Sequence, residues 1–420
     1  MTGSVLGPDA HGVALVGALA ETHQTPFYVY DTAIYGARAQ ALRAALPAGS
    51  HLLYSVKANP HGCLLTTAFA AGCGLEIASP GELDRLTEVG LNPARALLVG
   101  PAKSDTLLES ALMAGVGTLV VESLRELHRL QAVAARVGCR DVAVALRLSL
   151  EGAKGSLRMS GHQFGMERAE ALECHSALAA SKRLRFAGYH GYLASQLLDA
   201  ADIAHNTELV LREVEALTSE VGVRPQVIDV GGGFGIPYTS SQSPLSLVDL
   251  AARLGRLAER AERDSFQLVF ESGRFLAGPA GALVCRVIDT KVIASRRYVL
   301  LDGGMNSSGI FGGSNSMRSL SHHVLRDGQL VHGGPASNLC GPLCTPMDRL
   351  ATSVPCSAEV GDLVVWWNMG AYGLTAAPTA FLSFPRLHEV FVESETGSPA
   401  GSASKTSSKS DARIDVKWRR

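Results

Sequence analysis

Lys57 lies in the stretch YSVKANP (54–60), where it ends an apolar, β-rich run. An ammonium group loses solvation in partly dry surroundings, so its pKa falls and the neutral amine becomes available as a nucleophile. Lysines of this kind form Schiff bases with aldehydes. A lysine at a strand end more commonly extends to water, so the chemistry of Lys57 depends on what accompanies it.

A run of three glycines, 231–233, follows another apolar run in the stretch DVGGGFG (229–235). Without side chains, successive backbone N–H groups can close around an anion such as phosphate. Glycine runs also form ordinary turns, and this one is not a GxGxxG dinucleotide fingerprint in its usual context. A position after the seventh strand of an α/β barrel would favour phosphate, because phosphate sites recur there.

Glu271 follows the apolar run QLVF and precedes a short turn. A carboxylate at this place can keep a pyridine nitrogen protonated, so that the ring accepts electrons. Lys57 could hold an aldehyde and the glycine run could hold a phosphate. The three features together predict pyridoxal 5'-phosphate (PLP) as the cofactor.

The elements around these residues form a repeating pattern. Eight short β-rich runs alternate with stretches in which apolar residues recur every three to four positions, the helical period. This alternation predicts an α/β fold, a (β/α)8 TIM-like barrel with buried parallel strands. The runs are HLLYSVKA (51–58), GLEIAS (74–79), ALLVG (96–100), TLVVES (118–123), VAVALRLSL (142–150), FAGYHGYL (186–193), QVIDVGGG (226–233) and QLVFESG (267–273).

The barrel prediction also locates the active site, because catalytic residues on this fold lie at the C-terminal ends of the strands. Polar residues fall at these ends in the first, second, sixth, seventh and eighth runs. They are Lys57, Glu76, His190, Tyr192, the glycines Gly231, Gly232 and Gly233, Glu271 and Arg274.

The pattern changes after residue 275 to a succession of strands with few helical stretches between them. We therefore expect a C-terminal β domain. The predicted organisation is an N-terminal segment (1–30) that joins the β domain, the barrel (31–274), the β domain (275–395) and a disordered tail (396–420). The tail is rich in Ser, Gly, Lys and Ala and has few residues able to bury.

Composition excludes several classes of function. The 420 residues carry 38 Lys and Arg against 39 Asp and Glu, a net charge of -1, so no overall field favours nucleic acid or an anionic membrane. The N-terminus lacks the basic region of a signal peptide, and no apolar run of about 18 residues occurs. We expect a cytoplasmic protein. The eight cysteines show no CxxC pairs and no zinc-like spacing, so we expect reduced thiols and no metal.

From about residue 25 to 390 the chain resembles the fold-type III PLP-dependent decarboxylases, the family of diaminopimelate and ornithine decarboxylases, whose fold is alanine racemase-like. Eight blocks occur in the family's order. They are TPFYVYD, YSVKANP, GLEIASPGEL, GYHGYLASQ, DVGGGFGIPY, ESGRFLAGPAG, GPLCTPMDRL and NMGAYGLTAAPTAF.

The resemblance implies a role for each matching residue. Lys57 would form the Schiff base with the cofactor, and Glu271 would pair with the pyridine nitrogen. The phosphate would be surrounded by Gly231, Gly232, Gly233, Ser195, Arg274 and Tyr372. In a head-to-tail homodimer, Cys344 of one subunit would enter the other's site and act in protonation after carbon dioxide leaves. We place Glu76, His190 and Tyr192 in the cofactor site, and Arg274, Thr345, Asp348 and Tyr372 at the substrate.

Two departures from the family pattern bear on the substrate. In GYHGYLASQ, Tyr192 stands where diaminopimelate decarboxylases have a histidine that stacks on the ring; an aromatic ring can still stack but cannot carry the imidazole's proton. Thr345 and Pro346 follow Cys344, where relatives acting on diamines or diaminopimelate have an acid. A buried, unpaired distal ammonium costs several kcal/mol, which disfavours lysine, ornithine and diaminopimelate. Asp348 remains, three residues beyond Thr345.

The sequence thus predicts α-decarboxylation of an amino acid or amino-acid-derived substrate in a specialised biosynthetic pathway. GPLCTP and GAYGLTAAPTAFLSFP resemble the subgroup that includes decarboxylases of carrier-protein-bound amino acids and exosortase-associated homologues, so the substrate class includes aminoacyl groups on a carrier protein. The basic tail could guide an acidic carrier. The alternatives are diaminopimelate decarboxylation, racemisation and a catalytically silent regulatory homologue. Glu271 disfavours a racemase, which gains from a less electron-withdrawing ring.

Overall fold

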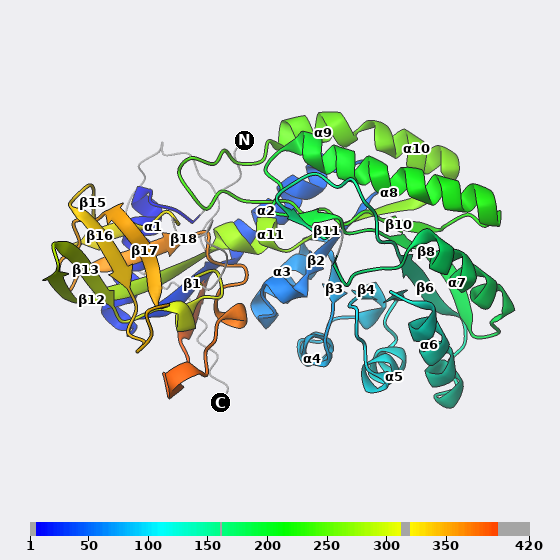
Figure 1. Ribbon diagram of the computed structural model, residues 1–420, viewed down its shortest axis with the longest axis horizontal. Coiled ribbons are helices and arrows are strands. Elements are labelled where there is room, and N and C mark those ends of the chain that lie inside the picture. The colour runs from blue at the N-terminus through cyan, green and yellow to red at the C-terminus, as the bar shows by residue number, and fades with distance from the viewer. Residues whose placement is uncertain (1–5, 160–161, 312–319, 394–420) are drawn as a thin grey trace, which may run out of the picture. The chain divides into compact units, whose positions relative to one another are not determined.

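The computed structural model describes residues 6–159, 162–311 and 320–393, and the chain divides into two compact units (Figure 1). The barrel unit comprises residues 38–237 and 242–276. The β unit comprises the described residues of 1–37, 238–241 and 277–420. The tail predicted for 396–420 lies outside the described residues.

The barrel unit contains a closed barrel of eight parallel strands in the order β10-β11-β2-β3-β4-β5-β6-β8. Each strand corresponds to one of the eight runs expected from the sequence, so the TIM-like barrel is confirmed. The strands are β2 (His51–Ser55), β3 (Gly74–Ile77), β4 (Ala96–Leu98), β5 (Thr118–Val121), β6 (Val142–Arg147), β8 (Leu184–His190), β10 (Val227–Asp229) and β11 (Gln267–Ser272).

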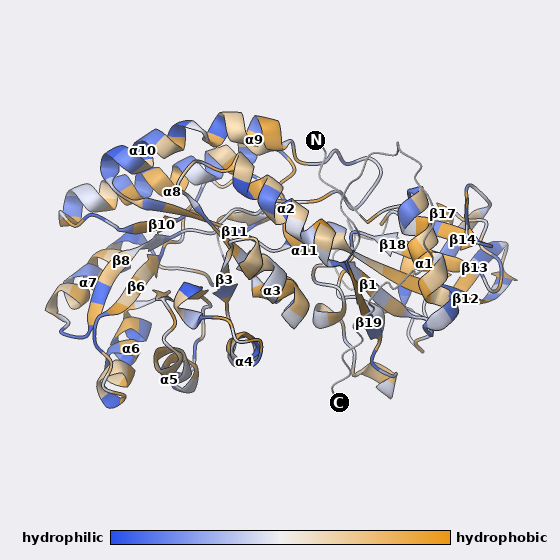
Figure 2. Ribbon diagram, turned by 180° about the vertical axis from the view of Figure 1, so that it is seen from behind, coloured by the Kyte–Doolittle hydropathy of each residue, from blue (hydrophilic) through white to orange (hydrophobic). Residues whose placement is uncertain are grey.

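Helices surround the barrel strands and begin at identifiable caps. Ser79, Ser104 and Ser123 each accept a hydrogen bond from a backbone N–H in the first turn of the helix that follows. Helix α10 (Arg256–Asp264) has no buried residue and is coloured largely hydrophilic in Figure 2. The helices are α2 (Thr32–Ala45), α3 (Gly62–Ala70), α4 (Pro80–Glu88), α5 (Asp105–Ala114), α6 (Leu124–Arg136), α7 (Arg168–Ala180), α8 (Ala200–Val221), α9 (Leu247–Leu254), α10 (Arg256–Asp264) and α11 (Arg274–Ala277).

The interior of the barrel is closed by packed aliphatic side chains. Leu53, Leu97, Val120, Ala145 and Val269, from five different strands, form one buried cluster with Val99. A filled interior leaves the ends of the strands as the place where polar side chains can gather. A short two-stranded ribbon, β7 (Leu157–Arg158) with β9 (Ala194–Ser195), lies in the loops that follow β6 and β8.

The β unit is built on a nine-stranded sheet. The early strand β1 pairs with β12 in antiparallel and with β19 in parallel orientation, and helix α1 (Ala10–Thr22) precedes it. The remaining strands of the sheet are hydrogen-bonded in the order β15-β14-β18-β12-β13-β16-β17. The strands are β1 (Phe27–Asp31), β12 (Gly281–Ile293), β13 (Arg296–Leu301), β14 (His323–Arg326), β15 (Gln329–Val331), β16 (Ala336–Cys340), β17 (Arg349–Pro355), β18 (Leu363–Trp367) and β19 (His388–Val392).

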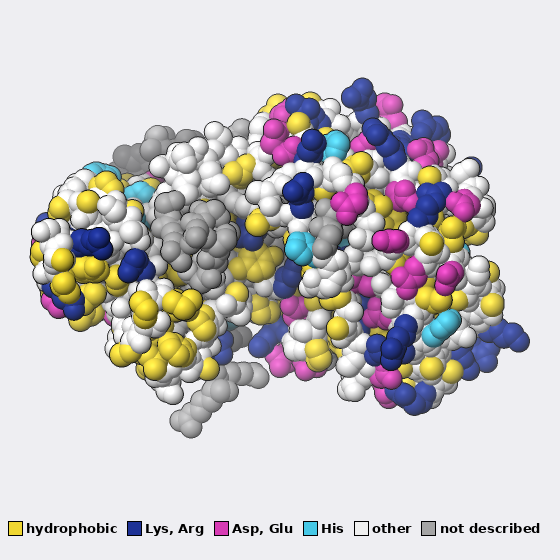
Figure 3. All heavy atoms as spheres, in the orientation of Figure 1, with side chains coloured by type: hydrophobic (Ala, Val, Ile, Leu, Met, Phe, Trp, Pro, Cys, Tyr) yellow, Lys and Arg dark blue, Asp and Glu magenta, His cyan; other side chains and the backbone are white. Residues whose placement is uncertain are grey.

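The distribution of surface charge agrees with the balanced composition. Figure 3 shows basic and acidic side chains interspersed over this face of the barrel unit. Among the described residues, no helix has both the length and the hydrophobicity that a membrane crossing requires.

Candidate active site

Lys57 lies on a single turn of 3-10 helix, Val56–Ala58, rather than on the strand that the sequence predicted to reach residue 58. Strand β2 ends at Ser55, and the turn carries the lysine past the strand end. Its Nζ atom lies 2.7 Å from Oε1 of Glu76 on β3, and the Lys57 side chain is 41% exposed against 1% for Glu76. The Lys57 side chain is therefore more exposed to solvent than expected, and the buried carboxylate of Glu76 balances its charge.

Tyr192 provides an aromatic surface next to this lysine. Nζ of Lys57 lies 5.6 Å from the centroid of the Tyr192 ring. Burial raises the pKa of the Tyr192 phenol, although the nearby Lys57 and a hydrogen bond with Ser195 oppose the shift. The phenol therefore stays neutral near pH 7 and presents an uncharged ring.

The glycine run forms a tight backbone turn directly after β10. Gly231 and Gly233 have φ angles of +66° and +70°, which residues with a side chain rarely adopt. A Cβ atom on Gly231 would lie 2.7 Å from Cδ2 of Tyr192, and one on Gly233 would lie 2.2 Å from the Ala194 carbonyl oxygen. The turn can therefore pack against Tyr192 and Ala194 only because these positions lack side chains.

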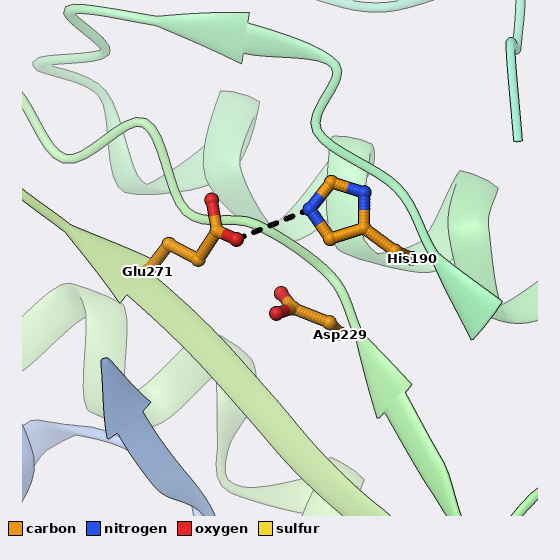
Figure 4. A group of neighbouring side chains, drawn as sticks. All are labelled: His190, Asp229 and Glu271. Atoms are coloured by element: carbon orange, nitrogen blue, oxygen red, sulfur yellow. Dashed lines mark hydrogen bonds and ion pairs between the residues drawn. The ribbon is translucent and has the colours of Figure 1, made fainter. Parts of the chain in front are cut away.

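A buried cluster of ionisable groups lies at the neighbouring strand ends (Figure 4). His190 and Asp229 are the last residues of β8 and β10, and Glu271 is the penultimate residue of β11. Strand β10 lies between the other two in the barrel, and one side-chain nitrogen or oxygen from each residue lies within 4.8 Å of the others. Nε2 of His190 lies 3.1 Å from Oε1 of Glu271. Burial alone would raise the pKa of Glu271, but His190, Lys57 and Arg147 together lower it below its ordinary value. Glu271 is thus an anion deep in the site.

Arg147 and its partners were not singled out from the sequence. Arg147 ends β6, and its Nη1 atom donates to Oε1 of Glu122 at 2.8 Å, with both side chains almost fully buried. The other Glu122 oxygen accepts from the N–H of Gly165, and the guanidinium lies 4.7 Å from the ring centroid of Phe164. Arg147 therefore holds the loop after β6 and adds positive charge near Glu271. In the sequence, the feature that could have drawn attention to Arg147 is a cation within the otherwise apolar run VAVALRLSL.

The remaining predicted barrel residues lie in the segments that follow β8 and β11. Ser195 belongs to β9, where it pairs with Leu157. Arg274 is the first residue of α11, directly after β11.

Four predicted residues belong to the β unit: Cys344, Thr345, Asp348 and Tyr372. The Cys344 side chain is exposed. Tyr372 adopts φ +55°, a conformation uncommon for residues with a side chain and enriched where geometry serves function. The roles of Cys344, Thr345 and Tyr372 remain predictions.

Asp348 has a structural task in this unit. Its carboxylate accepts hydrogen bonds from the N–H groups of Met305 and Leu343, both at 2.7 Å, and the residue is 3% exposed. Burial raises the pKa of Asp348, and the two hydrogen bonds oppose the shift. This geometry favours a role in holding the Cys344 loop over the predicted contact with a substrate.

The barrel residues fit pyridoxal phosphate. The amine of Lys57 suits an aldehyde, the Tyr192 ring offers a stacking face, and the anionic Glu271 suits a pyridine N–H. Within the described part of the chain, the N–H groups of Gly232 and Gly233 have no acceptor, so they are available to an anion.

Comparison with known proteins agrees with this geometry. Residues 34–278 match the family model described as pyridoxal-dependent decarboxylase, pyridoxal binding domain. The chain is 30% identical over 390 residues to L-glutamyl-(BtrI acyl-carrier protein) decarboxylase of Niallia circulans, covering 90% of this chain and 91% of that protein. It is 32% identical over 365 residues to diaminopimelate decarboxylase of Neisseria meningitidis serogroup A, covering 86% and 87%. The crystal structure of diaminopimelate decarboxylase from Helicobacter pylori complexed with L-lysine matches with a TM-score of 0.79 at 25% identity, over 90% of this chain and 94% of that one.

Proposed function

Because this chain belongs to the family of pyridoxal-dependent decarboxylases, we propose that it removes the α-carboxylate from an amino acid whose distal end carries no free ammonium. Aminoacyl groups attached to a carrier protein are the members of this class that we favour. The decarboxylase activity and the PLP cofactor follow from the family. The substrate class is our inference from this chain's own residues.

When bound, pyridoxal phosphate supplies a ring that accepts the electron pair left behind by departing carbon dioxide. Lys57 would hold the aldehyde carbon until the substrate amine replaces it. Glu271, kept anionic by His190, would hold the proton on the pyridine nitrogen. Gly232 and Gly233 would donate backbone N–H groups to the phosphate, with Ser195 and Arg274 beside them.

Cys344 is the proposed source of the proton that replaces carbon dioxide, either directly or through a water that it positions. Its exposed thiol lies in the loop that Asp348 holds. We further propose that two copies of the chain form a homodimer in which Cys344 of one subunit serves the site of the other.

Two observations support a substrate without a distal ammonium. The residues after Cys344 are Thr345 and Pro346, neither of which carries a negative charge. The acid that follows, Asp348, is already engaged by two backbone N–H groups. A distal ammonium would therefore find no available carboxylate among these residues, and a buried charge left unpaired costs several kcal/mol. The Niallia circulans relative acts, by its name, on a glutamyl group attached to a carrier protein.

Diaminopimelate is the second candidate substrate. The Neisseria meningitidis diaminopimelate decarboxylase is as similar to this chain as the carrier-protein enzyme is. For this chain to act on diaminopimelate, a residue other than Thr345 or Pro346 would have to pair with the distal ammonium of the substrate.

Mass spectrometry of the PLP-loaded protein in D2O tests the proposal, with a panel of free amino acids, diaminopimelate, and glutamyl and other aminoacyl carrier proteins. Loss of carbon dioxide with gain of one deuterium from a carrier-bound or distally uncharged substrate is the expected result. Efficient reaction of diaminopimelate or lysine would overturn the proposed substrate class. Deuterium gain without loss of mass would indicate racemisation, and no change across the panel would favour a silent homologue.

A further inference from the structure

Asp229 is the member of the buried cluster that the proposed mechanism does not use. Its Oδ1 atom accepts a hydrogen bond from the N–H of Gly231 at 2.9 Å, the first residue of the glycine turn. Its other oxygen, Oδ2, is buried and has no hydrogen-bond partner among the described residues. Figure 4 shows the carboxyl group facing Glu271 and His190. One side-chain nitrogen or oxygen atom of each of the three residues lies within 4.8 Å of the others.

Two carboxylates this close in a dry site repel one another, so they do not both ionise readily. His190 contacts Glu271 directly, and Lys57 and Arg147 add to its stabilisation, so the negative charge rests on Glu271. Burial raises the pKa of Asp229 well above its ordinary value, with further increases from the charges of Glu271 and Glu76. An ionised Oδ2 without a donor would add a further desolvation cost.

We propose that Asp229 is a positioning residue that remains a neutral carboxylic acid in the working enzyme, with its O–H directed at the Glu271 carboxylate. The inference rests on the proposed function, in which Glu271 serves the pyridine nitrogen. Through Oδ1 the same side chain holds Gly231, so it connects the phosphate-binding turn to the carboxylate at the ring. It also keeps Glu271 as the single anion of the cluster.

Asparagine is the matched test of this idea. In Asp229→Asn the side-chain oxygen can still accept from Gly231, and the amide N–H2 can still donate to Glu271, so the variant imitates the neutral acid. Asp229→Ala removes both contacts. We therefore expect Asp229→Asn to weaken PLP binding by less than about tenfold, and Asp229→Ala to weaken it by a further tenfold to hundredfold. Both are measured by fluorescence titration of the apo-protein with PLP.

Infrared difference spectroscopy tests the protonation state directly. The PLP-loaded wild type, minus PLP-loaded Asp229→Asn, should show the C=O stretch of a protonated carboxylic acid at pH 8, where an ordinary Asp is ionised. Absence of this band would overturn the proposal, as would equal losses of PLP affinity in the Asn and Ala variants. Neither measurement involves substrate, so a failure here is separable from failure of the proposed decarboxylation. The infrared result decides the question even if the alanine variant does not fold.

Discussion

The ammonium of Lys57 and the carboxylate of Glu76 meet at 2.7 Å beside two neighbouring barrel strands, and of the two only the lysine reaches solvent. The buried carboxylate supplies a fixed counter-charge, and the Lys57 side chain is 41% exposed. Under the proposed function, this pair marks the place where the cofactor would become covalently attached.

Replacing Lys57 by alanine should therefore remove covalent attachment of PLP and reduce turnover by about a thousandfold or more. Borohydride reduction followed by peptide mass spectrometry should locate the cofactor on the peptide that contains Lys57 in the wild type and nowhere in the variant. Lys182→Ala, which changes an exposed lysine on the same unit, serves as the control. Full activity of Lys57→Ala would rule out the proposed function.

Glu82 gives the barrel a pH-dependent stability. Burial raises its pKa from 4.5 to about 7, although the N–H of Ala78 opposes the shift. Between these values the folded state binds more protons than the unfolded state, so the free energy of unfolding falls as pH rises. Allowing for partial exposure, Glu82→Gln should be more stable than the wild type by about 1–2 kcal/mol at pH 8, and not at pH 5.

Urea denaturation at the two pH values measures this difference. Glu88→Gln, which removes an exposed acid of the same helix, should show no such pH dependence. A constant difference between Glu82→Gln and the wild type would contradict the raised pKa.

The buried pair of Arg147 and Glu122 predicts non-additive mutations. Arg147→Met leaves an uncompensated buried carboxylate, and should lower the free energy of unfolding by about 3–5 kcal/mol. The double variant Arg147→Met/Glu122→Gln should lose less free energy of unfolding than Arg147→Met alone, because the double variant leaves no buried charge unpaired. Denaturant unfolding of the variants measures the coupling. Arg136→Met, in the exposed pair with Glu109, should cost no more than about 1 kcal/mol.

Thr345→Glu tests the basis of the proposed selectivity. A carboxylate directly after Cys344 would give a distal ammonium a partner, and should raise kcat/KM for diaminopimelate or lysine by about tenfold or more. Steady-state kinetics on both substrates measures the change. Thr345→Gln has a similar size without the charge and should leave both values low; an equal gain in the two variants would show that charge is not the cause.

The proposed sharing of sites between two subunits predicts complementation between impaired chains. After mixed reassembly, Lys57→Ala and Cys344→Ala chains should form heterodimers with one intact site each, giving about one quarter of wild-type activity from a statistical mixture. A Lys57→Ala/Cys344→Ala chain mixed with Cys344→Ala should give no recovery. If each subunit used its own Cys344, the first mixture would stay at the level of its components.

Local sequence patterns were sufficient to predict the barrel, because each strand and its helix are neighbours in the chain. The contacts between side chains from different strands were not accessible in this way. Asp229 stood in the stretch DVGGG, and a carboxylate two residues before a glycine run was a signal, but its neighbour Glu271 comes from another strand. Arg147 likewise pairs with Glu122, which lies 25 residues away. The sequence shows that position 348 is an acid, but it does not show that backbone N–H groups already bind this carboxylate.

The contact between Tyr192 and Gly231 also constrains how this site can change over generations. Any side chain at position 231 would collide with the ring at 192, so the effect of a mutation at one position depends on the residue at the other. A lineage that replaced Tyr192 by a smaller residue would remove the clash with the ring. A Cβ at position 231 would still lie 3.0 Å from the Gly191 carbonyl oxygen, and the backbone of Gly231 would still be left-handed. Directed evolution of the ring-stacking position should therefore vary residue 192 in libraries that keep glycine at 231.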